Sequence, residues 1–149
     1  MRLSVANGLR LLICGWTAGL LAFVVLGCGG SGGSRVAGRV VPVSEGDFHI
    51  SAPNRLTAGE YTLRVHNEGP TQHELIVVPY PSWHLPIRAD GLTVSEETIQ
   101  TREVGALEPG GAGAVRDLQL HLTPGRYIMF CNMEGHYMAG MHHELVVTS

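Results

Sequence analysis

Residues 125–147 read GRYIMFCNMEGHYMAGMHHELVV and hold three side chains with metal-binding chemistry at even spacing. Cys131 is followed five residues later by His136, and His136 is followed five residues later by Met141. A thiolate, an imidazole and a thioether are soft or borderline ligands, a combination that suits copper. Apolar runs with strand character enter and leave this segment, so we expect a ligand loop between two strands.

A copper site of this kind needs one more histidine. Blue-copper centres combine two His and one Cys in a plane with a weak axial Met, and the loop from Cys131 to Met141 supplies one His. His73 is the best candidate, because it stands where a turn signal at residues 67–70 meets the most apolar strand candidate, residues 73–80. The histidines on the polar side of other strand candidates are expected to face solvent: His49, His66 and His121.

The segments around these residues resemble the cupredoxin family. NEGPTQH, residues 67–73, leads into a strand, and PGRYIMFCNMEGHYMAGM, residues 124–141, carries a Cys-x4-His-x4-Met loop similar to those of rusticyanin, auracyanin and sulfocyanin. The resemblance covers residues 36–149. It implies one type 1 copper ion per chain, with three equatorial ligands and one axial ligand. The equatorial ligands would be His73, Cys131 and His136, and the axial ligand would be Met141.

Four neighbouring residues have roles that the resemblance leaves open. Glu74 stands where many cupredoxins have Asn or Asp after the first ligand, so its part in joining the two ligand loops is open. Asn132, directly after the cysteine, is a candidate for a hydrogen bond across the loops. His142 and His143 either shape the face through which electrons are exchanged or are exposed polar residues that begin a strand.

Short strand candidates separated by turn signals predict an all-β sandwich, and the resemblance implies a Greek-key, cupredoxin-like sandwich or barrel. Thr93-Val-Ser-Glu96 fits a capping box, so a short helix from Val94 to Arg102 is expected in a connecting excursion. The turn signals are Glu45-Gly46, residues 57–60, and residues 108–113. The expected strands are two within 39–52 around the Glu45-Gly46 turn, then 61–66, 73–80, 114–122, 126–131 and 144–148.

Residues 1–27 have the pattern of a secretory signal, with Arg2 and Arg10 before the uncharged apolar run Leu11–Leu26. The end of this segment resembles a bacterial lipobox, which implies cleavage before Cys28 and a lipid on its sulfur. An uncleaved anchor is the alternative, although the run is shorter than the roughly 20 residues that span a bilayer. Residues 28–35, which include GGSGGS, are expected to be a flexible tether, and residues 36–149 the folded domain.

Charge and cysteine usage narrow the function. From residue 28 onward the chain has eight Arg, no Lys and thirteen acidic residues, which disfavours nucleic acid as a partner. Cys14 lies in the signal and Cys28 is the lipid site, so Cys131 has no disulfide partner within the domain. A lone thiol is a liability in an oxidising compartment unless it has a function, and bound copper would supply one.

We therefore expect an electron carrier held at a membrane in the periplasm or at the cell surface, which docks transiently with membrane-bound redox proteins. A copper chaperone or scavenger is the alternative. An enzyme is not expected, because chemistry such as nitrite reduction needs a second copper site, and no second histidine cluster stands at ligand spacing.

Overall fold

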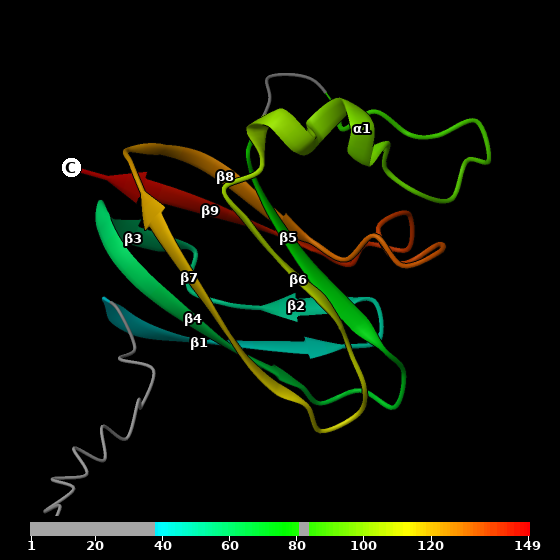
Figure 1. Ribbon diagram of the computed structural model, residues 1–149, viewed down its shortest axis with the longest axis horizontal. Coiled ribbons are helices and arrows are strands. Elements are labelled where there is room, and N and C mark those ends of the chain that lie inside the picture. The colour runs from blue at the N-terminus through cyan, green and yellow to red at the C-terminus, as the bar shows by residue number, and fades with distance from the viewer. Residues whose placement is uncertain (1–37, 81–83) are drawn as a thin grey trace, which may run out of the picture. The chain divides into compact units, whose positions relative to one another are not determined.

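Two β-sheets pack face to face in the computed structural model, which describes residues 38–80 and 84–149 (Figure 1). The predicted signal, tether and lipid site at Cys28 lie outside the described residues. In chain order the elements are β1 Arg39–Gly46, β2 His49–Ser51, β3 Arg55–Thr57, β4 Gly59–Asn67, β5 His73–Pro79, α1 Glu96–Ile99, the 3-10 turn η1 Gln100–Arg102, β6 Gly105–Gly110, β7 Val115–Leu122, β8 Gly125–Phe130 and β9 His142–Thr148.

One sheet has the strand order β2-β1-β4-β7 and the other the order β3-β9-β8-β5-β6. β1 pairs with β4, and β3 with β9, in parallel, while the other neighbours are antiparallel. The prediction of an all-β sandwich with a short helix in a connection is confirmed. No helix within the described residues combines the length and the hydropathy needed to cross a bilayer.

The core follows from the alternation of apolar residues along the strands. On β4, Tyr61, Leu63 and Val65 point into the space between the sheets, each at most 2% exposed. β5 is buried on both faces, because Leu75 and Val77 join the core between the sheets, whereas Ile76 and Val78 pack in a second cluster. This second cluster lies between the sheet and the α1 excursion and contains Ile76, Val78, Leu85, Val94, Ile99, Ile128 and Phe130. The nearly unbroken apolar run at 73–80 reflects these two contacts.

The predicted start of the helix is wrong by two residues. Ser95, not Thr93, is the N-cap of α1, and its side chain makes no capping hydrogen bond. Val94 instead forms an isolated bridge with Ile87 and is fully buried. Asp90 accepts the hydrogen bonds that hold the preceding turn, including one from the Thr93 backbone at 3.2 Å. Packing of β-branched Val94 therefore outweighs the capping-box pattern.

Two strands were not predicted, and both lie at the edges of a sheet. β6 contains Pro109 and Gly110, which indicate a turn, but Pro is tolerated on an edge strand because one side of the strand needs no ladder hydrogen bonds. β3 is three residues long and pairs only with β9. The first turn also lies later than predicted: Gly46 pairs with His49, so Asp47 and Phe48 form the turn.

Candidate metal centre

Three connections meet at one end of the sandwich: the β1–β2 turn, the β4–β5 connection and the loop between β8 and β9 (Figure 1). His73 is the first residue of β5, and Cys131 directly follows β8. His136 lies within the loop and Met141 directly precedes β9. Residues separated by nearly seventy positions in the sequence are therefore carried to the same place by the strands.

The structure brings His73, Cys131 and His136 together, with one ligand atom of each lying within 4.8 Å of the others. The two imidazole Nδ1 atoms are 3.3 Å apart, and the Cys131 Sγ atom is 3.4 Å from His136 Nδ1. His73 and Cys131 are 0% exposed, whereas His136 is partly exposed. Two imidazole nitrogens and one sulfur thus converge in a site that is closed on its inner side.

Met141 is held beside this cluster by the backbone. Its N–H donates to the carbonyl of His136 at 3.0 Å, and its carbonyl accepts from the N–H of Cys131 at 3.1 Å. Its side chain is fully buried in the same apolar cluster as Cys131. The loop reaches this arrangement through tight turns in which Gly135 and Gly140 have φ of 79° and 101°, values that glycine adopts without strain.

The thiol of Cys131 is free and fully buried. Burial raises its pKa to about 11, although hydrogen bonds from the backbone N–H groups of Glu74 and Met133 act in the opposite direction. The thiolate is the form that binds metal, and it forms readily when a cation takes the place of the proton. Two N–H donors directed at the sulfur would stabilise that thiolate, so the donor set and its surroundings fit a soft metal ion.

Glu74 and Asn132 join the two ligand segments, a role that the sequence left open. Burial raises the pKa of the Glu74 carboxyl, while a hydrogen bond from the Asn132 backbone N–H to that carboxyl lowers it. The Asn132 side chain accepts from Val94 N–H at 2.6 Å and donates to Glu96 Oε1 at 2.8 Å. The segment after Cys131 is therefore tied both to β5 and to the α1 excursion.

Asn67 is a buried positioning residue that sequence reasoning missed. Its Nδ2 donates to the carbonyls of Thr71 and Gly110 at 2.7 and 2.9 Å, and its Oδ1 accepts from Gly69 N–H at 3.0 Å. These bonds shape the connection that ends at His73. The sequence does carry a signal for Asn67, because it is a polar residue at the inward position where the apolar alternation of β4 ends.

Asn67→Ala is expected to lower the free energy of unfolding by about 1–3 kcal/mol, because the carbonyls of Thr71 and Gly110 lose a donor and Gly69 N–H keeps only its 3.3 Å bond to the Glu45 carbonyl. Urea unfolding followed by circular dichroism measures the effect. Asn54→Ala is the control, since Asn54 is exposed and only its backbone carbonyl is bonded; it should change stability by less than about 0.5 kcal/mol. Equal effects of the two variants would contradict the role of Asn67.

The remaining histidines lie outside the cluster. His49, His66 and His121 are exposed, as expected from the alternation. His142 is exposed at the start of β9, where its ring lies 5.5 Å from that of Tyr137 in the ligand loop. His143 is half-buried, with Nε2 3.4 Å from the carbonyl of Pro53. Both residues thus begin a strand, and His142 also contacts the ligand loop.

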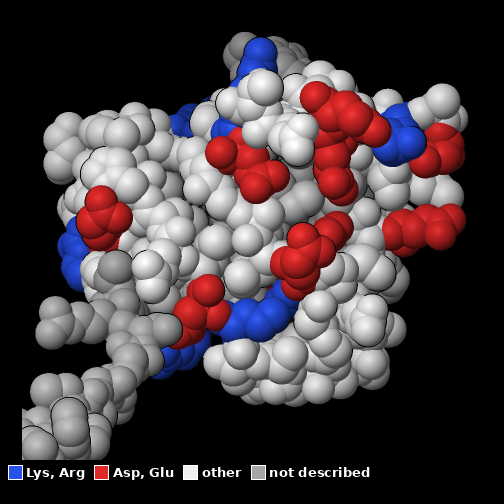
Figure 2. All heavy atoms as spheres, viewed as in Figure 1, with Lys and Arg blue, Asp and Glu red and all other residues white. Residues whose placement is uncertain are grey.

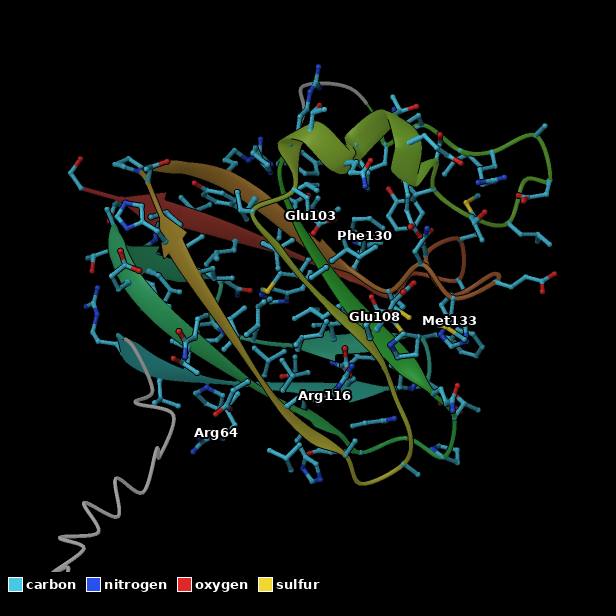
Figure 3. All side chains as sticks on the ribbon, viewed as in Figure 1. Arg64, Glu103, Glu108, Arg116, Phe130 and Met133 are labelled. Atoms are coloured by element: carbon cyan, nitrogen blue, oxygen red, sulfur yellow. The ribbon has the colours of Figure 1, made fainter. Side chains whose placement is uncertain are left out.

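A buried ion pair lies between the sheets on the inner side of the cluster. Arg116 of β7 donates to Glu45 of β1, whose carboxyl group is 0% exposed, and to the carbonyl of Glu108 in β6. Figure 3 shows Arg116 close to Glu108. Burial raises the pKa of Glu45 to about 7, an effect that Arg116 partly offsets. Burial is the main cause that lowers the pKa of His73, and the positive charge of Arg116 is a smaller cause in the same direction.

Comparison with known proteins finds the same architecture in solved structures. No family model and no curated relative match the chain. Auracyanin B matches with a TM-score of 0.57 at 24% identity, covering 79% of this chain and 97% of its own. Auracyanin A of Chloroflexus aurantiacus, a blue copper protein, matches with a TM-score of 0.57 at 17% identity, covering 74% of this chain and 98% of its own. Rusticyanin of Thiobacillus ferrooxidans matches with a TM-score of 0.52 at 15% identity, covering 75% of this chain and 79% of its own.

Proposed function

We propose that this chain, which has the cupredoxin fold, is a type 1 copper protein that carries single electrons between redox partners outside the cytoplasm. The observation that carries the proposal is the convergence of His73 Nδ1, Cys131 Sγ and His136 Nδ1 at one end of the sandwich. A free, buried thiol together with two imidazoles is the donor set of a blue-copper site.

His73, Cys131 and His136 would hold the ion, and Met141 would supply a fourth, weaker donor. Copper in such a set changes between Cu(I) and Cu(II) by one electron. The protein supplies a rigid site from which water is excluded, because His73, Cys131 and Met141 are 0% exposed. Donors that are fixed by buried strands and backbone hydrogen bonds need little movement when the charge at the site changes.

His136 is the proposed exit for the electron, because it is the one histidine of the cluster with an exposed edge. Two exposed apolar side chains come from the segments that surround it: Phe48, which is 51% exposed and contacts the His136 ring, and Met138, which is 53% exposed. A small apolar surface of this kind suits brief encounters with redox proteins, whose interfaces are small.

The charge distribution supports a protein partner rather than nucleic acid. Acidic side chains gather over α1 and its neighbouring loop on the face shown in Figure 2, and Asp90, Glu96 and Glu97 are exposed there. The whole chain has a formal net charge of −3. Nucleic-acid binding needs a basic surface instead.

Membrane attachment through Cys28 is part of the proposal and rests on the sequence pattern of residues 1–35. A lipid at Cys28 and the GGSGGS tether would keep the domain near membrane-bound redox partners and raise its effective concentration there. Mass spectrometry of the protein purified from membranes is expected to show a chain that begins at a lipid-modified Cys28. A chain that still contains residues 1–27 would favour the uncleaved anchor.

Copper loading separates the carrier from the chaperone or scavenger alternative. A carrier is expected to show an intense visible thiolate-to-copper absorption that ascorbate bleaches and ferricyanide restores over repeated cycles. It should also release little copper to a Cu(I) chelator, because the inner ligands are fully buried. A colourless Cu(I) protein that quickly yields its metal to the chelator would favour the chaperone.

Met141→Gln is expected to retain copper but to lower the reduction potential, because an amide oxygen stabilises Cu(II) better than a thioether does. A roughly hundredfold change in the preference between the two oxidation states corresponds to about 120 mV for one electron. Spectroelectrochemical titration measures the shift. Met138→Gln, on the exposed part of the same loop, is the control and should leave the potential nearly unchanged; a shift as large as that of Met141→Gln would refute the axial assignment.

A further inference from the structure

The β1–β2 turn contacts both histidines of the cluster. Asp47 and Phe48 form the turn between the paired residues Gly46 and His49. Asp47 Oδ1 lies 3.2 Å from His73 Nε2, and the Phe48 ring meets the ring of His136 edge-on, with 5.3 Å between the centroids. The turn therefore touches the outer side of the cluster at two points.

His73 Nε2 is the ring nitrogen that faces away from Cys131 and His136. It is fully buried, and no acceptor meets it at the geometry of a straight hydrogen bond. The Asp47 carboxylate is the charged group beside it, and Thr71 Oγ1 holds that carboxylate through a 2.8 Å hydrogen bond to Oδ1. A buried imidazole nitrogen thus has one close carboxylate, which a neighbouring hydroxyl keeps in place.

The chain makes room for this contact at Gly69. A Cβ atom at Gly69 would lie 2.9 Å from Asp47 Oδ1 and 2.9 Å from His73 Nε2, distances at which one of the two groups would have to move. The absence of a side chain at this buried position is therefore a condition for the approach of Asp47 to His73.

Phe48 has an unfavourable backbone conformation in this turn. It is the only described residue other than glycine with positive φ, at 61°, a conformation that is unfavourable for a bulky side chain. It also leaves half of a large apolar side chain exposed. A two-residue hairpin turn favours positive φ, and the ring that this turn presents meets the His136 imidazole.

We propose that Asp47 is the positioning residue for His73, and that its carboxylate lowers the reduction potential of the site. The inference rests on the proposed function. A carboxylate beside Nε2 keeps the proton on that nitrogen, so that Nδ1 presents its lone pair towards Cys131 and His136. The same negative charge favours the oxidised, more positive state of the ion.

Asp47→Asn tests the charge, because the amide retains an acceptor of the same size. With copper bound, its reduction potential is expected to rise by the equivalent of a three- to tenfold change in the preference for Cu(I), about 30–59 mV. Asp117→Asn is the matched control: Asp117 is 35% exposed against 36% for Asp47, and it pairs with Arg64 away from the cluster. Equal potentials in the two variants would overturn the electrostatic part of the proposal.

Asp47→Ala and Gly69→Ala test the positioning, since the first removes the carboxylate and the second displaces it. Both are expected to weaken copper affinity 10–100-fold, whereas Asp47→Asn should keep it within a fewfold of wild type. If Asp47→Ala does not fold, Gly69→Ala and Asp47→Asn still give this contrast. Unchanged affinity in a folded Ala variant would overturn the positioning role.

A readout without copper separates this inference from the proposed function. In the metal-free protein, nitrogen-15 NMR is expected to find the neutral His73 ring with its proton on Nε2, and Asp47→Ala should mix the two tautomers while Asp47→Asn should not. If wild-type protein fails to form the thiolate-to-copper band, the proposed function fails. If the band forms but the tautomer and the potential do not respond to Asp47, only the inference about Asp47 fails.

Discussion

Cys131→Ser is expected to abolish the visible thiolate-to-copper absorption entirely while leaving the sandwich folded. Among the described residues Cys131 is the free cysteine, and its sulfur lies 3.4 Å from His136 Nδ1 in the cluster with His73. A serine hydroxyl has no comparable charge-transfer transition, so the colour must disappear even if copper still binds. The N–H groups of Glu74 and Met133 can donate to the Ser oxygen as they do to the sulfur, which limits the loss of stability to about 1–3 kcal/mol.

Visible absorption of copper-loaded protein, with circular dichroism as the check on folding, measures this result. His142→Gln is the matched control, because His142 lies one residue after Met141 but outside the cluster. It should keep the full absorption. A folded Cys131→Ser protein that remains blue would falsify the assignment of the thiolate ligand.

Arg116→Met is expected to lower the free energy of unfolding by about 3–5 kcal/mol at pH 8, because above its pKa of about 7 the buried Glu45 carboxylate is left without its partner. Glu45 is 0% exposed and its Oε1 atom has no hydrogen bond, so Arg116 is its principal compensation. Arg116 also donates to the carbonyl of Glu108 across to β6, a contact that the variant loses. The effect on folding should therefore exceed that of any exposed charge.

The loss should grow with pH. The pKa of Glu45 is raised from an ordinary value of 4.5 to about 7 in the folded protein, so between these values the folded state binds more protons than the unfolded state. Stability from this group then falls as pH rises through that window. Without Arg116 the folded pKa moves higher still, so the variant should lose more stability than wild type between pH 5 and pH 8.

Urea unfolding at pH 5 and pH 8 measures both effects. Arg64→Met is the matched control: Arg64 is 47% exposed in its pair with Asp117, and it should cost less than about 1 kcal/mol. The double variant Glu45→Leu with Arg116→Met should recover much of the loss, since it removes both buried charges. If Arg116→Met costs no more than Arg64→Met, the buried pair does not contribute as described.

The proximity of Cys131 and His136 could be predicted from sequence because both stand on one short loop with Met141. The soft and borderline donors of these three side chains are what point to copper. His73 required one further step, the recognition of a turn that enters a strand buried on both faces. A residue where a turn enters such a strand lies at an end of the sandwich, and in the structure His73 Nδ1 is 3.3 Å from His136 Nδ1.

The supporting residues could not be predicted in the same way, because their roles depend on contacts between distant segments. The sequence does not point to Asp47, because its pattern predicts the turn at Glu45-Gly46, two residues before the turn in the structure. Glu45 does carry a signal in the sequence, because Val41, Val43 and Glu45 alternate on the inward face of β1. Its partner Arg116 comes from β7, and no local pattern identifies a pair across two strands. Edge strand β6 could not be predicted either, because its Pro and Gly indicate a turn and its pairing with β5 is a contact between distant segments.

Stepwise addition of Cu(II) to the metal-free protein, followed by visible absorption, tests the central claim most directly. We expect an intense thiolate-to-copper band that grows linearly and stops at one copper per chain. No such band, or one that continues to grow towards a second equivalent, would contradict a single copper site formed by His73, Cys131 and His136.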